Sequence, residues 1–121
     1  MSVYVEGNHK AFTTGEAIGQ HILVNIESGV IMICGVNEVA IGTTDAAAAS
    51  GAVVSVHLLS AAGTMFGVTD SSITGGAICY AQAAGKVSSS SATNAHVLGV
   101  AMASANSGDI IEFMPSLVGS N

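Results

Sequence analysis

Apolar and polar residues alternate along this chain in short runs separated by Gly, Ser, Thr, Asn and Asp. In Ile18–Glu27, residues Ile22, Val24 and Ile26 fall on one side of an extended chain, and the residues between them fall on the other. Ala52–Leu59 alternates in the same way. A period of two is the pattern of a β-strand with one buried face. These runs therefore predict strands rather than helices.

Short polar segments predict where the strands turn back on themselves. We expect hairpin turns at Glu27–Gly29, at Ala84–Lys86 and at Ser104–Gly108, because each segment lies between two apolar runs. Thr43–Ser50 (TTDAAAAS) is the one helical feature, and it is long enough for at most one short helical turn or a loop. No repeat of fixed period is visible.

The spacing of these runs, roughly 8–12 residues, predicts about eight to ten short strands in an all-β fold. We expect a compact antiparallel β-barrel or β-sandwich with short hairpins. Residues 1–17 are interpreted as an N-terminal arm that docks on a partner, 18–114 as the β-domain and 115–121 as a flexible tail. Further strands are predicted at Ser2–Glu6, Val30–Cys34, Val36–Ile41, Met65–Thr69, Ile73–Ala81, Val97–Ala103 and Asp109–Met114.

Charge is scarce in this chain, which changes the expected partners. Charged residues make up 8% of the chain and hydrophobic residues 50%, so we expect part of the surface to be buried against other subunits. The net charge is −6, with no arginine and only Lys10 and Lys86. Two lysines cannot neutralise a phosphate backbone or an anionic bilayer, so nucleic acid and membrane partners are disfavoured.

Neither a membrane span nor a secretory signal is expected. Ala46–Val68 is uncharged, but polar residues at every second or third position favour strand, turn and strand. The first residues lack a basic region followed by an apolar stretch, which predicts synthesis in a reducing cytoplasm. Cys34 and Cys79 lie alone in apolar runs and are expected to be buried thiols.

The histidines are candidates for a metal site, but their spacing matches neither HxH nor HExxH. Each lies in or beside an apolar run, so we interpret them as ordinary surface or hydrogen-bonded side chains and expect no metal and no cofactor. A site in which one histidine from each of several subunits converges is the alternative. These residues are His9, His21, His57 and His96.

No enzyme is predicted from the remaining polar residues. The chain has no GxSxG nucleophile elbow, and Asp70 and Asp109 fit turn positions. Glu112 alternates with apolar neighbours, as an outward-facing strand residue does. A small hydrolase would instead require a pocket that unites His57 or His96 with a serine and a carboxylate.

Several stretches resemble one family when they are read in order: Ile41–Ala47, Gly76–Tyr80 (GAICY), Ala83–Val87 (AAGKV), Leu98–Ala103 (LGVAMA) and Gly108–Phe113 (GDIIEF). They are similar to the capsid cement, or head-decoration, proteins of tailed bacteriophages, the small family known as domain of unknown function 2190. The N-terminal residues depart from the pattern of this family.

The resemblance implies a β-rich homotrimer on the outer surface of an icosahedral phage head, which clamps the major capsid protein against the pressure of the packaged DNA. Because the apolar start of the chain has no hairpin partner nearby, Val3, Tyr4, Val5 and Phe12 are the predicted contacts with the capsid or a neighbouring copy. The alternative is a carbohydrate- or host-surface-binding β-module, although the chain has no tryptophan to form a sugar-stacking platform.

Overall fold

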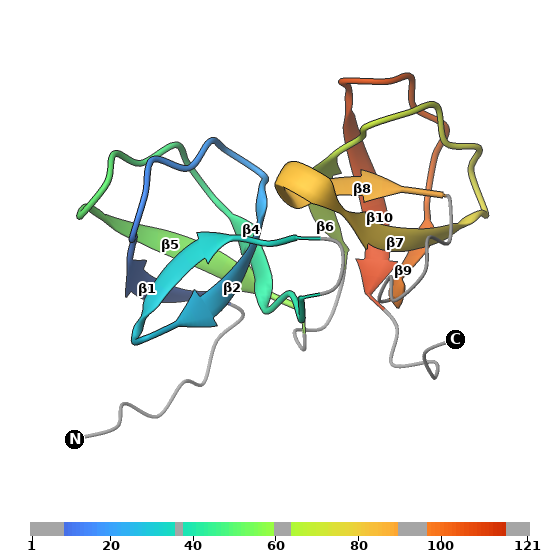
Figure 1. The fold of residues 1–121 in the computed structure, drawn as a ribbon. Coiled ribbons are helices and arrows are strands. Elements are labelled where there is room, and N and C mark those ends of the chain that lie inside the picture. Colours follow the sequence, from blue (N-terminus) through green and yellow to red (C-terminus); the bar gives the residue numbers. More distant parts are fainter. Residues whose placement is uncertain (1–8, 36–37, 60–63, 90–96, 116–121) are drawn as a thin grey trace.

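The computed structural model describes residues 9–35, 38–59, 64–89 and 97–115. Within these residues the chain forms two five-stranded antiparallel sheets that lie side by side (Figure 1). We call β1–β5 with their loops the first lobe. Its strands are β1 (His9–Thr13), β2 (Leu23–Glu27), β3 (Val30–Ile33), β4 (Gly42–Thr44) and β5 (Val53–Leu58).

The second lobe follows in sequence and has the same number of strands. It also contains the short 3-10 turn η1 (Ala83–Gly85) between two paired strands. Its strands are β6 (Met65–Val68), β7 (Ile78–Gln82), β8 (Lys86–Ser88), β9 (Val97–Ala101) and β10 (Ile110–Pro115). The all-β prediction is confirmed, and the two sheets pack in a sandwich-like manner without closing into a barrel.

The two lobes share one topology. The strand order is β1-β5-β4-β2-β3 in the first sheet and β6-β10-β9-β7-β8 in the second. Each strand of the second lobe therefore takes the place of the strand at the same rank in the first lobe. The expectation that the chain contains no repeat is therefore wrong. Gly42–Gly51 and Gly99–Gly108 share a glycine, two alanines, a serine and a final glycine at the same spacing, while most other side chains differ between the lobes.

Two buried threonines mark the same position in each lobe. The hydroxyl of Thr14 donates a hydrogen bond to the carbonyl of Ala49 at 2.7 Å, and the hydroxyl of Thr69 donates to the carbonyl of Asn106 at 2.6 Å. Both threonines are almost fully buried, so each hydroxyl needs this partner. The hydrogen bond holds the loop after the first strand against the loop before the last strand.

The core of the first lobe lies on one face of its sheet. Ile22, Val24, Val54 and Val56 are buried together there, as the period-two pattern predicted. Phe12 is one of the partly buried residues packed against this cluster. Alternation predicts the buried face of β5 correctly. It is wrong for β2, where Leu23 and Asn25 are buried beside Val24 and Ile26 is 50% exposed.

The second cluster joins the lobes. Ile111 and Phe113 of β10 pack in it together with Leu23 and Cys34 of the first lobe. Leu23 and Cys34 are completely buried although they lie outside the cluster that fills the first lobe. The second lobe therefore covers residues of the first sheet that its own loops leave uncovered.

Gly85 of η1 lies in close contact with the first lobe. Its N–H donates to the carbonyl of Cys34 at 2.9 Å. A Cβ at this position would lie 2.4 Å from Cγ2 of Ile22 and 2.8 Å from the carbonyl oxygen of Leu23. Its φ of 69° is in the left-handed region that favours glycine. Both the space and the backbone conformation therefore require a glycine here.

The predicted hairpins β2–β3, β7–β8 and β9–β10 are confirmed by their pairing. The described part of the predicted strand Val36–Ile41 is not a strand, so this expectation is wrong. Thr43–Ser50 forms a loop after the first residues, which belong to β4, in agreement with the expectation of at most one short helical turn. The segment Ala46–Val68 contains strands of both lobes, and no helix in the described part of the chain is long and apolar enough to cross a membrane.

Candidate functional surfaces

The predicted arm is described only from His9 onward, so Val3, Tyr4 and Val5 lie outside the described residues. Phe12 lies in β1, opposite Val54 of β5, and its side chain is half-buried. β1 is the edge strand of the first sheet, so this part of the predicted arm is paired within the lobe. A contact between Phe12 and a partner stays a prediction and would involve the exposed part of its ring.

The outer face of the second sheet carries several exposed apolar side chains beside Glu112. Ile78 and Met114 both pair with Val100, so these three side chains form a row across β7, β9 and β10. Ile110 lies on the same side of β10, two positions before Glu112. Ile78, Ile110 and Met114 are 49%, 56% and 45% exposed, which is high for side chains of this size. We call these four apolar residues the outer apolar face.

The corresponding face of the first sheet is more polar and carries a cluster of titratable groups. Nδ1 of His9 donates a hydrogen bond to Oδ2 of Asp45 at 2.7 Å. The ring of His57 lies 4.6 Å from that of His9 between centroids, at an interplanar angle of 51°. The ligand atoms of the three side chains all lie within 4.8 Å of one another. We call these residues the His-Asp-His cluster.

The strands and one loop set the geometry of this cluster. His9 and His57 are directly opposite each other in the β1–β5 pairing. Asp45 follows β4, where its N–H donates to the carbonyl of Ser55 and its own carbonyl accepts from Nε2 of Gln20. Burial and the nearby His9 lower the pKa of His57, and Asp45 opposes this shift. His57 is therefore biased toward the neutral imidazole.

The spacing of His9 and His57 along the sequence gives no sign that they are neighbours. Only the pairing of β1 with β5, which are distant in sequence, brings them together. His21 lies elsewhere, with its ring 5.6 Å from that of Phe66 between centroids. His96 lies outside the described residues.

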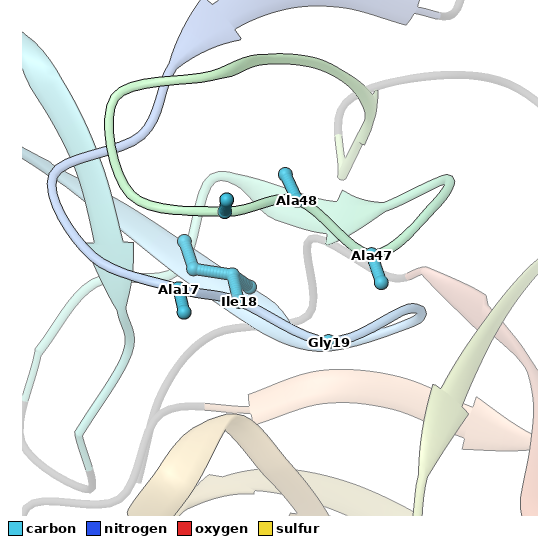
Figure 2. A pocket seen from close by; sticks show the side chains of 6 residues that line it. Ala17, Ile18, Gly19, Ala47 and Ala48 are labelled. Carbon is cyan, nitrogen blue, oxygen red and sulfur yellow. The ribbon is translucent and has the colours of Figure 1, made fainter.

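Each lobe has a shallow groove between its two apposed loops. In the first lobe, alanines and Gly19 line it, with Ala17 and Ile18 on one loop and Ala47 and Ala48 on the other (Figure 2). Reciprocal backbone hydrogen bonds between Ile18 and Ala48 hold these loops together. The residues that line this groove carry no charged or nucleophilic side chain, so it offers no group for catalysis.

The groove of the second lobe is polar, but its carboxylate has a structural role. Asp109 accepts a hydrogen bond from the N–H of Asn106 at 3.2 Å, which confirms its predicted place in a turn. Asp70 accepts from the hydroxyl of Ser71 at 3.1 Å. Glu112 accepts from the hydroxyl of Thr64, as a strand residue on the outer side of the sheet. The carboxylates considered for catalysis thus bond to neighbouring turns and strands.

The two cysteines are buried thiols, as predicted. Both Cys34 and Cys79 are 0% exposed, and neither forms a disulfide. Burial raises the pKa of Cys79 to about 11. Burial, together with the charge of Glu38, raises the pKa of Cys34 to about 11 as well. Neither thiol is activated as a nucleophile.

Comparisons with known proteins identify the fold but no family. No protein-family model matches the chain, and no curated protein matches it. Among solved structures, the head fiber gp8.5 N base of bacteriophage phi29 is similar to it, with a TM-score of 0.75 and 14% sequence identity. The match covers 93% of this chain and 97% of that chain, so both lobes take part in it. Membership of the cement-protein family is not confirmed.

Proposed function

We propose that this chain is a structural protein of a bacteriophage virion that attaches to the outside of the head. The observation that carries this proposal is the similarity of its whole two-lobed fold to the head fiber N base of phage phi29. The order of strand-and-turn stretches that resembles the cement proteins supports the same class of role. The fold similarity, together with this sequence pattern, therefore favours a role at the surface of a phage head.

The surface chemistry supports a role in assembly. The outer apolar face leaves large side chains exposed on a sheet, which is typical of a surface that binds another protein. The net charge of −6 and the lack of arginine disfavour contact with packaged DNA and fit a place outside the shell. The buried thiols and the hydrogen-bonded carboxylates give no support to an enzyme.

The finer proposal is that of a cement protein. The chain would bind the major capsid protein as a homotrimer and stabilise the head against DNA pressure, because a ligand that binds only the assembled shell stabilises it by mass action. Repetition over the lattice would add avidity. The residues before β1 would provide the contact with the capsid or with a neighbouring copy.

A binding experiment with shells tests the proposal. The purified chain is mixed with empty heads assembled from the major capsid protein encoded in the same genome, and the shells are then sedimented. We expect the chain to sediment with the shells at a saturating, fixed ratio, and electron cryo-microscopy to show added density on the outer surface. A chain that stays in the supernatant at all ratios would contradict attachment to the head.

Stabilisation is tested separately from attachment. Shells with and without the bound chain are heated, and the temperature of shell disruption is recorded by light scattering. A higher temperature with the chain bound supports the cement role. Binding without any change in this temperature would leave a head-attached structural protein, such as the base of a fiber, and would exclude cementing.

A further inference from the structure

We propose that the His-Asp-His cluster of the first lobe binds a divalent transition-metal cation of the zinc type. The cluster consists of His9 of β1, Asp45 after β4 and His57 of β5. Each residue comes from a different segment, so the cation would connect three parts of the lobe. This inference does not depend on the proposed role of the chain at the phage head.

The donor set fits this class of cation. Two imidazole nitrogens and one carboxylate oxygen are ligands that zinc accepts in proteins, whereas calcium and magnesium prefer oxygen ligands throughout. The three ligand atoms lie within 4.8 Å of one another. Small rotations of these partly exposed side chains would bring them to the distance of about 2.0–2.2 Å at which zinc holds its ligands. A fourth position would remain open for water or another ligand.

The groups around the cluster do not compete with a cation. Lys10 follows His9 in β1 and therefore points to the opposite face of the strand, where its Nζ lies 5.9 Å from the centroid of the Phe12 ring. Lys86, the only other lysine, begins β8 in the second lobe. The chain has no arginine and a net charge of −6, so its overall field attracts cations.

Two hydrogen bonds to the backbone of Asp45 orient the site. The N–H of Asp45 donates to the carbonyl of Ser55 at 2.9 Å, and Nε2 of Gln20 donates to the carbonyl of Asp45 at 3.0 Å. The pairing of β1 with β5 fixes the other two ligands. A cation bound to Nδ1 of His9 takes the place of the proton that this nitrogen donates to Oδ2 of Asp45, and the neutral imidazole then carries its single proton on Nε2.

The second lobe shows that the cluster is not a requirement of the scaffold. Met102 occupies the position of Asp45, since its N–H donates to a carbonyl of the last strand in the same way. The β6–β10 register, continued by one residue, places Thr64 and Met114 where the first lobe has His9 and His57. The shared fold is therefore formed without these ligands, which are specific to the first lobe.

The expected effect of the cation is to fasten the edge strand. Among the described strands, β1 is an edge strand that pairs with β5 alone. A cation held by β1, by β5 and by the loop between β4 and β5 would link this edge strand to the rest of the lobe. Binding to the folded chain alone would also raise its stability by mass action.

Isothermal titration of the full, tag-free chain with zinc chloride tests this inference. We expect saturable binding of one zinc ion per chain, with no measurable binding of calcium or magnesium. H57Q and D45N should each weaken zinc binding at least about tenfold. H21N is the matched control, because His21 lies outside the cluster at a left-handed position that asparagine tolerates, and it should bind like the wild type.

The result that would overturn the inference is equal binding by the wild type and H57Q, or no saturable binding by the wild type. Loss of binding in H21N with retention in H57Q would place the zinc elsewhere and would also overturn it. Circular dichroism of each variant without metal checks that the fold is retained. A rise in melting temperature on addition of zinc, seen for the wild type and H21N but not for H57Q, provides the second readout.

Discussion

At the scale of single residues, the buried hydroxyl groups of Thr14 and Thr69 hold two loops together in each lobe. Thr69 is completely buried, and its hydroxyl donates to the carbonyl of Asn106. Replacing it with valine keeps the shape but leaves that carbonyl without this donor. We expect Thr69→Val to lower the free energy of unfolding by about 1–3 kcal/mol in urea titrations. The exposed Thr74→Val serves as the control, and an equal loss in both variants would contradict this role.

The thiols give a second prediction at this scale. With pKa values raised to about 11, Cys34 and Cys79 should not react with a thiol reagent near neutral pH until the chain unfolds in denaturant. A thiol with a raised pKa keeps its proton in the folded chain, so the unfolded chain ionises first. The contribution of the two protonated thiols to the free energy of unfolding is fully present below pH 9.0. It decreases as the pH rises toward about 11. Fast labelling of both thiols in native buffer would contradict the prediction.

Sequence reasoning succeeded where a side chain is placed by its immediate neighbours. The alternation around Val56 identified the buried face of β5, because side chains in a strand change sides at every residue. It failed for His9, Asp45 and His57, because they meet only through pairing of distant strands. No local pattern encodes the register that brings them together.

At the scale of elements, Gly85 determines how closely η1 packs against the first lobe. Gly85 and Gly29 both have left-handed backbones, but a Cβ would collide with the first lobe only at Gly85 and would meet nothing within 4 Å at Gly29. Gly29→Ala should therefore cost only backbone strain of about 1–2 kcal/mol. Gly85→Ala should cost about 1–3 kcal/mol more, since the lobes must separate to make room. Equal unfolding free energies for the two variants would show that this contact is not important.

Element boundaries were predicted less well than the elements themselves. The predicted strands Ile18–Glu27 and Ile73–Ala81 begin at Leu23 and Ile78 in the structure. In each lobe the first part of the run instead forms a loop, held through the bridges of Ile18 and Ile73. An apolar loop residue that is buried through a single β-bridge looks the same in the sequence as a buried strand residue. The alternation pattern therefore cannot distinguish the two.

The outer apolar face should matter for the whole molecule. We expect the wild-type chain to form an oligomer, and Ile110→Lys to shift it toward the monomer, because a lysine at an apolar contact would be buried without a partner. Val53→Lys is the matched control, since Val53 is also an exposed strand residue but lies in the first lobe. Multi-angle light scattering measures the mass of each variant. Loss of the oligomer in both variants, or in neither, would contradict the assignment.

Removal of the N-terminal residues tests the predicted arm in the whole molecule. Deletion of residues 1–8 ends immediately before β1, so the pairing of His9–Thr13 with β5 is retained. We expect the truncated chain to keep its oligomeric state and melting temperature and to lose binding to shells in the sedimentation assay. Shell binding equal to that of the full chain would contradict a docking role for this segment.

The repeated topology allows the surfaces of the two lobes to differ from each other. Two lobes of one fold within one polypeptide are equivalent to a heterodimer whose subunits are covalently fused. Two identical subunits must carry the same substitutions, so a change that improves one surface alters the other as well. Fusion removes this constraint and fixes the ratio of the lobes. One lobe can then carry ligands for a cation while the other presents an apolar surface, on the same scaffold and from a single gene.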